Sequence, residues 1–124
     1  MNVVDSSGWL VYFSDSPNAG SFAPVIQSIE NLIVPTVCMY EVFKRLLAQH
    51  GEESALLAIG VMSLGTVVEL TREIAIDAAR ISIELKIPMA DSLILATTRA
   101  YHATLWTQDA DFEGIQGVRY IKNQ

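Results

Sequence analysis

The sequence has few of the residues that build several common kinds of site. Only one of its 124 residues is cysteine, so Cys38 cannot form an internal disulfide, and we expect a buried, inert thiol. The two histidines, His50 and His102, do not form a zinc-binding pair such as H-x-x-x-H. Neither a P-loop nor a G-x-G-x-x-G motif is present. These absences argue against disulfide-stabilised, histidine-zinc and nucleotide-loop proteins.

Long apolar runs and basic residues are scarce as well. No run reaches the roughly 18 apolar residues that a transmembrane helix needs. The N-terminal residues lack a basic region before an apolar stretch, so we expect no secretory signal, no membrane partner and a cytoplasmic location. Lys and Arg total 8 against 14 Asp and Glu, for a net charge of −6. This balance argues against non-specific nucleic-acid binding through a broad basic surface, although it does not exclude a nuclease.

Apolar residues, by contrast, are abundant. They make up 51% of the chain, whereas charged residues make up 18%, so we expect one globular domain over residues 1–124. A domain of this size has much surface for its volume, and part of the apolar material should remain exposed in the monomer. We therefore expect a protein partner or self-association.

Apolar and β-branched runs alternate with segments of helical periodicity. Strands are predicted at residues 2–5, 32–34, 66–70, 105–107 and 118–121. Helices are predicted at residues 8–14, 19–30, 52–62 and 91–102, with two more that Thr36 and Thr71 cap. The helix after Thr71 carries its apolar face on Ile74, Ala78, Ile81 and Leu85. This alternation predicts an α/β fold with a mostly parallel sheet of about five strands, covered on both faces.

Four carboxylates fall where such a fold would gather them. Asp5 ends the first predicted strand, and Asp109 follows the fourth. Glu41 lies just inside the helix after the second strand, and Asp91 opens a later helix. Ligands of open parallel sheets bind beyond the carboxyl ends of the strands. The four positions therefore predict one acidic pocket.

Each acid has a plain structural alternative when it is taken alone. Asp5 could be an Asx-type cap, and Asp91 could be a first-turn acid that the helix dipole favours. Asp109 and Asp111 could form a solvated turn. Glu41 could pair with Lys44 or Arg45 on the helix surface, an interaction worth only about 0.2–0.5 kcal/mol.

Their joint placement indicates a metal site. Two carboxylates about 5 Å apart repel by roughly 3 kcal/mol at an effective dielectric constant near 20, so such a cluster needs protons or cations. Oxygen ligands favour Mg²⁺ or Mn²⁺, and a carboxylate metal site can hydrolyse a phosphodiester. Candidates for phosphate binding are Lys44 and Arg45 near Glu41 and Arg99 two turns beyond Asp91, although all three could simply be solvated or ion-paired.

Four segments of the sequence also occur in the order of a known family. They are Val3-Val4-Asp5-Ser6-Ser7-Gly8-Trp9, Val34-Pro35-Thr36 leading to Glu41, Ala90-Asp91-Ser92-Leu93-Ile94-Leu95-Ala96, and Thr107-Gln108-Asp109-Ala110-Asp111-Phe112. Together they span nearly the whole chain. On these segments the sequence resembles a PIN domain, and within that family the VapC-type toxins most closely.

The resemblance implies a three-layer α/β/α sandwich and an Mg²⁺- or Mn²⁺-dependent ribonuclease. Asp5, Glu41, Asp91 and Asp109 match the family's metal-site acids. Supporting positions are Ser6, a polar neighbour of the first acid, Thr107, a hydroxyl that supports the site, and Asp111, an additional acid. The resemblance further implies an RNA substrate, a homodimer, and a cognate antitoxin that inserts into the active-site groove.

Two other interpretations remain open at this stage. A phospho-acceptor receiver domain has a similar length and sheet, but it needs an acid pair after the first strand and an aspartate after the third. Here Asp5 is followed by Ser6, and the third predicted strand ends at Glu69-Leu70. The other interpretation is a catalytically inactive PIN-like scaffold that only binds, although all four acids are present.

Overall fold

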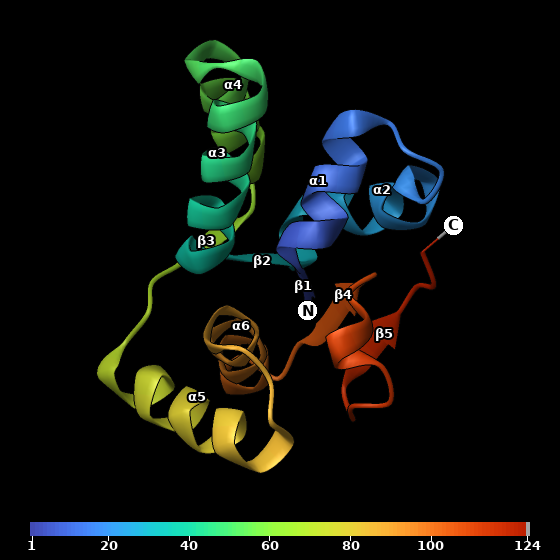
Figure 1. Ribbon diagram of the computed structural model, residues 1–124. Helices are drawn as coiled ribbons and strands as arrows, with labels where there is room; N and C mark the ends of the chain where they lie inside the picture. The colour runs from blue at the N-terminus through green and yellow to red at the C-terminus, as the bar shows by residue number, and fades with distance from the viewer. Residues whose placement is uncertain (124) are drawn as a thin grey trace.

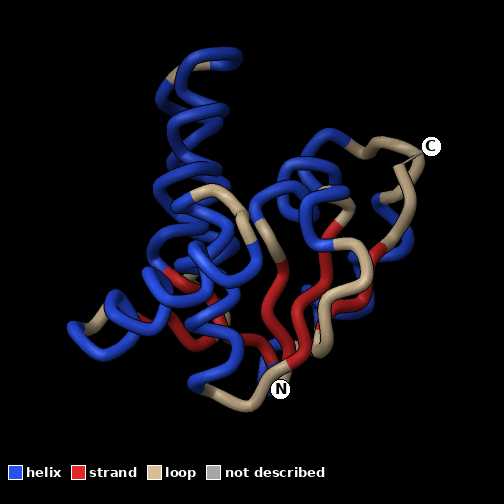
Figure 2. Tube along the Cα trace, turned by 60° about the horizontal axis from the view of Figure 1, so that its bottom comes forward, coloured by secondary structure: helices blue, strands red, loops and turns tan. Residues whose placement is uncertain are grey.

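The core of the fold is a five-stranded parallel sheet. We describe residues 1–123 from a computed structural model. The strands are β1 (Asn2–Val4), β2 (Leu32–Pro35), β3 (Thr66–Val68), β4 (Thr104–Thr107) and β5 (Val118–Tyr120). They lie in the order β3-β2-β1-β4-β5, and each pair of neighbours is parallel. The central strands appear as adjacent red segments in Figure 2.

Helices cover both faces of this sheet. They are α1 (Ser6–Ser14), α2 (Ala19–Gln27), α3 (Thr36–His50), α4 (Glu52–Met62), α5 (Arg72–Leu85) and α6 (Met89–Ala100), with short 3₁₀ turns η1 (Ile29–Asn31) and η2 (Ala110–Phe112). Figure 1 shows α1 to α4 on one side of the sheet and α5 and α6 on the other. Right-handed crossovers produce this division, because the chain reverses its direction across the sheet after β3. The predicted three-layer α/β/α fold is confirmed.

Burial on both faces of the sheet explains why the sequences of the central strands are continuously apolar. Val3 and Val4 of β1 are fully buried, and all four residues of β2 are buried, because helices pack on both faces. Helix α1 approaches β1 closely at Gly8. A Cβ atom at Gly8 would lie 2.7 Å from Val4 Cγ1 and 2.7 Å from Phe22 Cε1. Only glycine therefore allows α1 to pack this closely on β1 and α2.

Several predicted element boundaries need correction. Helix α1 begins at Ser6 rather than Gly8, because the Asp5 carbonyl accepts bonds from the Gly8 and Trp9 amides. Pro35, not Thr36, occupies the N-cap of α3, so Thr36 is already helical. The predicted N-cap at Thr71 is confirmed, since its hydroxyl accepts from the Ile74 amide at 3.2 Å.

The other corrections concern lengths. Helix α2 continues through Pro24 and ends at Gln27, before η1. Strand β3 is shorter than predicted, and helix α6 runs over Met89–Ala100 instead of 91–102.

Among residues 1–123, no helix is both long enough and apolar enough to span a membrane.

Candidate functional site

Strand register brings the first and last parts of the site together. In the β1–β4 pair, Val4 lies beside Trp106, and the Asp5 amide donates to the Trp106 carbonyl at 2.9 Å. The next residues along the two strands, Asp5 and Thr107, are therefore neighbours at the carboxyl edge of the sheet. Parallel pairing thus places side by side two residues that are far apart in the sequence.

Two hydroxyl groups hold the Asp5 carboxylate. Thr107 Oγ1 donates to Asp5 Oδ2 at 2.8 Å, and Ser7 Oγ donates to the same oxygen at 2.9 Å. Each hydroxyl also accepts a bond from a backbone amide, Thr107 from Asp109 at 2.9 Å and Ser7 from Gln108 at 3.3 Å. These bonds tie Asp5 to the loop that carries Asp109. Asp5 does occupy the N-cap of α1, as the capping alternative has it, but its side chain makes no capping bond to the helix.

Glu41 also faces the first strand's end rather than its helix neighbours. Ser6 Oγ donates to Glu41 Oε1 at 2.6 Å. Within residues 1–123 the single ion pair joins Arg80 and Asp77, so the alternative that Glu41 pairs with Lys44 or Arg45 is wrong. Ser6 therefore orients the carboxylate that α3 contributes.

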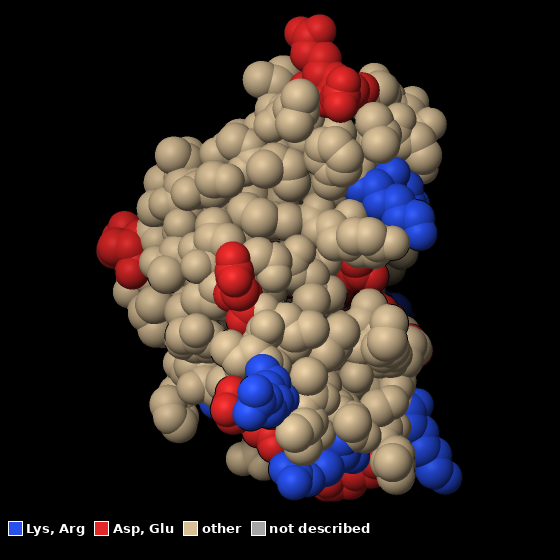
Figure 3. All heavy atoms as spheres, turned by 90° about the vertical axis from the view of Figure 1, so that its left-hand side faces the viewer, with Lys and Arg blue, Asp and Glu red and all other residues tan. Residues whose placement is uncertain are grey.

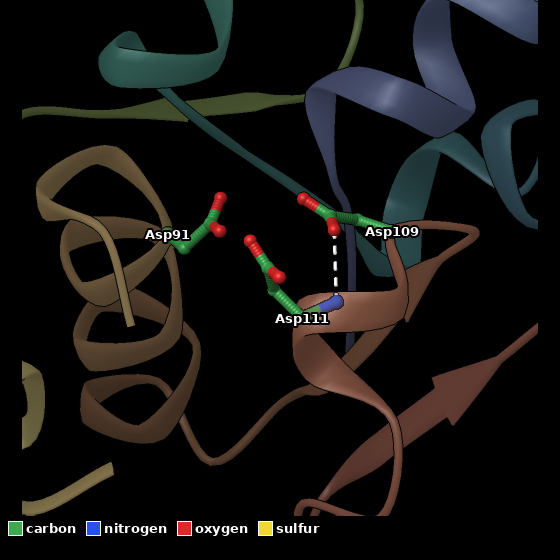
Figure 4. A group of neighbouring side chains, drawn as sticks. All are labelled: Asp91, Asp109 and Asp111. Atoms are coloured by element: carbon green, nitrogen blue, oxygen red, sulfur yellow. Dashed lines mark hydrogen bonds between the residues drawn. The ribbon is translucent and has the colours of Figure 1, made fainter. Parts of the chain in front are cut away.

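Three aspartates converge on one point beyond the end of β4. Asp91 lies in the first turn of α6, Asp109 follows β4, and Asp111 lies in η2. One carboxylate oxygen from each lies within 4.8 Å of the others. In Figure 4 the three side chains point toward one another, and the Asp111 amide donates to Asp109 Oδ1 at 2.9 Å. The turn that begins at Asp109 therefore aims Asp111 at Asp91.

Burial and the repulsion between carboxylates raise the pKa values of Asp91 and Asp5. The pKa of Asp91 is raised to about 7, chiefly by burial and then by the negative charges of Asp109, Asp5 and Asp111. Burial also raises the pKa of Asp5, whereas the hydrogen bonds from Thr107 and Ser7 oppose that rise. Both shifts have the same physical causes, burial of the carboxyl group and the negative charges gathered around it.

The four predicted acids line one cavity of about 480 Å³, which we call the acidic cavity. Asp5, Glu41, Asp91 and Asp109 contribute to its wall, together with Ser6 and Ser7. Lys44 and Arg45 of α3 line it as well. Figure 3 shows acidic side chains inside a hollow of the surface, with Lys and Arg side chains above it. The acidic cavity therefore combines a carboxylate cluster with a small number of cations.

Arg99, the third predicted phosphate-binding residue, lies elsewhere. It is in the last turn of α6 and lines a different cavity with Asp77 and Arg80. The prediction placed it near the acids because it lies on the Asp91 helix, but two turns of helix separate the two residues by about 12 Å along the axis. The fold does not bring Arg99 to the acidic cavity.

Sequence reasoning missed the role of Ser7. Its hydroxyl bonds Asp5, and its side chain lines the acidic cavity. The only signal in the sequence was its place two residues after a strand-end aspartate, which does not distinguish it from Ser6. Cys38, in contrast, is fully buried as predicted, with Sγ 3.7 Å from the Val4 carbonyl, and burial raises the pKa of its thiol.

Comparison with known proteins gives one family and several similar structures. The family model described as "PIN domain" matches residues 3–118. No curated protein sequence matches the chain.

The solved structures share the fold at low sequence identity. A toxin–antitoxin complex from Klebsiella pneumoniae contains a chain with a TM-score of 0.82 and 21% identity, covering 99% of this chain and 100% of that one. VapBC2 from Rickettsia felis, bound to a DNA fragment from its promoter, gives a TM-score of 0.75 at 13% identity, covering 98% and 97%. VapC20 from Mycobacterium tuberculosis, described as a sarcin-ricin loop cleaving toxin, gives 0.72 at 15% identity, covering 91% and 92%.

Proposed function

The chain belongs to the PIN domain family, and from this premise we propose that it is a metal-dependent endoribonuclease. Residues 1–124 form its single nuclease domain, and Mg²⁺ or Mn²⁺ is its cofactor. The receiver-domain alternative is wrong, because the family model that matches nearly the whole chain is that of a PIN domain. The observation that carries the proposal is the meeting of Asp5, Glu41, Asp91 and Asp109 in one cavity.

The residues present fit a divalent cation. Their donors are carboxylate oxygens, which suit Mg²⁺ and Mn²⁺. Oxygens of Asp91, Asp109 and Asp111 lie within 4.8 Å of one another, close enough to share one ion. Burial and the surrounding negative charges raise the pKa of Asp91 to about 7, so a cation would relieve a repulsion that the protein otherwise meets with a proton. We assign Asp5, Asp91 and Asp109 as ligands, Glu41 as a ligand or a residue that orients water, and Asp111 as a supporting acid.

The protein's own groups prepare the site for phosphodiester hydrolysis. A divalent cation, when bound, supplies activation of water near neutral pH and offsets charge on the leaving oxygen. Ser7 and Thr107 hold Oδ2 of Asp5 by donating to it, which leaves Oδ1 free of these bonds. Ser6 holds Glu41 through Oε1 in the same way. These hydrogen bonds keep both carboxylates in place before substrate arrives.

A small set of cationic side chains binds the phosphate groups of the substrate. Lys44 and Arg45 line the acidic cavity and form no ion pair within residues 1–123, so both are available to phosphate oxygens. Arg99 lies in a different cavity and is not part of this set. With a net charge of −6, the rest of the surface offers RNA little attraction.

A protein partner that silences the site is the second element of the proposal. The similar structures include a toxin–antitoxin complex and VapBC assemblies, which supports a toxin role with a cognate antitoxin. We place both proteins in the cytoplasm. We expect the antitoxin to cover the early helices and α3 and to place a basic side chain, preferably Arg, among the carboxylates. Arg suits this task because its planar guanidinium bonds carboxylates in a bidentate manner.

A homodimer completes the proposal. The buried face of α5 carries Ile74, Ala78 and Ile81, as predicted. On the same helix Ile76 is 49% exposed and Ile83 is 82% exposed, one above the other at a spacing of seven residues. An apolar stripe on an otherwise charged helix face favours association with a second copy of the chain.

Purified protein freed of its antitoxin tests the enzyme assignment directly. We expect it to cleave structured RNA with Mg²⁺ or Mn²⁺, and we expect cleavage to stop when EDTA is added. Asp5→Ala and Asp91→Ala should each lose cleavage, whereas Glu30→Gln should retain it, because Glu30 is an exposed acid of η1 that does not line the acidic cavity. Undiminished cleavage in EDTA or in both Asp variants would show that the site is wrong. Absence of both cleavage and Mn²⁺ binding in the unmodified chain would favour the inactive scaffold.

A further inference from the structure

We propose that Asn18 is a positioning residue of the metal site, because its side-chain amide fastens the turn that carries Asp109 to the segment that follows β5. The assignment rests on the proposed metal-dependent function and adds to it a residue that does not line the acidic cavity. Asn18 is polar yet only 5% exposed, and it lies in the connection between α1 and α2. In Figure 1 the chain after β5 leads toward this connection.

The side chain of Asn18 does not do what its position in the sequence favours. Asn18 occupies the N-cap of α2, and asparagine is among the residue types that cap helices best. Its side chain nevertheless makes no capping bond to α2. The amide instead bonds two groups that lie 90 and 104 residues further along the chain. Helix capping therefore does not account for this buried amide.

The Asn18 amide nitrogen uses its full donor capacity in these two bonds. Nδ2 donates to the Lys122 carbonyl at 3.0 Å and to Gln108 Oε1 at 3.0 Å. An amide nitrogen has two hydrogens, so each acceptor takes one of them. Gln108 is the residue before Asp109, and Lys122 is the second residue after β5. Asn18 thus joins the turn that carries Asp109 to the segment after β5.

This bridge continues the pairing of β4 with β5 past its last pair of residues. The last paired residues are Thr107 and Tyr120. One residue further, the Ile121 amide donates to the Thr107 carbonyl at 2.7 Å. Beyond that bond, the Asn18 amide links the residues that follow on each side. A side chain from a distant connection therefore keeps the ends of β4 and β5 together.

The turn that is held in this way positions two of the acids. The Asp109 amide donates to Thr107 Oγ1 at 2.9 Å, and the Asp111 amide donates to Asp109 Oδ1 at 2.9 Å. Asp91 comes from α6, a separate segment of the chain. Movement of the turn would therefore separate Asp109 and Asp111 from Asp91, and it would lower the affinity for an ion that all three share.

Hydrogen exchange and Mn²⁺ binding of Asn18→Ala test the assignment. In the metal-free protein we expect the Gln108 and Asp109 amides to exchange faster than in the unmodified chain, because the turn opens more often. Calorimetry should show a Mn²⁺ affinity lower by about tenfold, the lower end of the effect of groups that support metal ligands from outside. Thr71→Ala is the matched control, because it removes the N-cap bond of α5 and thus destabilises the fold at a residue that does not line the acidic cavity. It should leave both quantities unchanged.

Gln108→Met separates the two bonds of the bridge. It removes the acceptor in the turn and leaves the bond from Asn18 to Lys122 in place, so it also serves as the test if Asn18→Ala does not fold. We expect faster exchange of the Asp109 amide and weaker Mn²⁺ binding. The double variant should bind Mn²⁺ no more weakly than Asn18→Ala alone, because both changes break the same bond.

Unchanged exchange of the Asp109 amide in both Asn18→Ala and Gln108→Met would overturn the assignment. A loss of Mn²⁺ affinity in Thr71→Ala equal to that in Asn18→Ala would also overturn it, since general destabilisation would then explain both. Additive losses in the double variant would show that Asn18 and Gln108 act separately, against the proposed bridge. Failure of the unmodified chain to bind Mn²⁺ would contradict the metal-dependent function, whereas exchange in the metal-free chain decides separately whether Asn18 holds the turn.

Discussion

The Thr107 hydroxyl donates a 2.8 Å hydrogen bond to the Asp5 carboxylate across a sequence separation of 102 residues. Thr107 is fully buried, and its oxygen also accepts from the Asp109 amide. One side chain thus joins the acid that follows β1 to the loop that positions two further acids.

Loss of this hydroxyl should destabilise the fold and the site together. Thr107→Val keeps the shape of the side chain but leaves the Asp109 amide without its acceptor and Asp5 with one donor fewer. We expect a loss of about 1–3 kcal/mol in the free energy of unfolding, measured by urea denaturation, and weaker Mn²⁺ binding by calorimetry. Thr107→Ser, which retains the hydroxyl, should recover most of the Mn²⁺ affinity. Equal defects in both variants would mean that packing, not the hydrogen bonds, accounts for the role of Thr107.

Neutralising Asp91 should stabilise the metal-free protein. Asp91→Asn removes a charge that Asp109, Asp5 and Asp111 repel, so we expect a gain of about 1 kcal/mol, or a few degrees in the melting temperature, without metal. The same variant should lose most of the stabilisation that Mn²⁺ gives the unmodified chain. Glu30→Gln, an exposed control, should change neither quantity. A lower melting temperature for metal-free Asp91→Asn would contradict the repulsion.

Stability without metal should fall as the pH rises. The pKa of Asp91 is about 7 in the folded protein against an ordinary value of 3.8, so between these values the folded state binds more protons than the unfolded state. The free energy of unfolding therefore decreases from about pH 4 to pH 7, by at most about 1.4 kcal/mol per pH unit and by less for a half-exposed group. The raised pKa of Asp5 acts in the same direction. Urea denaturation across this range measures the slope, which Asp91→Asn should reduce; a rise in stability over this window would contradict the assignment.

Substitution of Lys44 or Arg45 should weaken RNA binding, whereas substitution of Arg99 should not. Lys44→Ala and Arg45→Ala remove side chains that line the acidic cavity, so each should weaken RNA binding and lower the salt dependence of log K by about 0.7 for each phosphate that is no longer neutralised. Arg99→Ala serves as the control, because Arg99 lines a different cavity. Anisotropy titrations at several salt concentrations measure both quantities. A defect in Arg99→Ala equal to that in Lys44→Ala would place the RNA across α6 as well.

Glycine at position 8 should be required for packing, unlike other helical glycines. In Gly8→Ala the new methyl group meets Val4 and Phe22 at 2.7 Å, so we expect a loss of about 1–3 kcal/mol in the free energy of unfolding. At Gly20 a Cβ would have no neighbour within 4 Å, and Gly20→Ala should be stabilising by up to about 1 kcal/mol through helix propensity. Thermal denaturation compares the two variants. Equal effects would show that α1 can move away from β1 at little cost.

The amino-acid sequence by itself determined the class of fold and the edge of the sheet where the acids gather. Alternating strand and helix patterns predict parallel strands, and all carboxyl ends of parallel strands lie on one edge. Asp5 follows β1 directly, and Asp109 follows β4 after one residue, so their placement needs no knowledge of packing. The roles of the four acids as ligands remain predictions that the experiments above test.

Only the tertiary structure decided which polar groups serve these acids. The strand order places β4 beside β1, which is why Thr107 reaches Asp5 Oδ2, the oxygen that Ser7 also bonds. The turn after β4 aims Asp111 at Asp91, and the length of α6 carries Arg99 away from the acids. The contacts of Thr107 with Asp5 and of Asp111 with Asp91 depend on interactions between elements distant in the chain. Local periodicity reports which face of an element is buried, but it contains no information about what lies opposite that face.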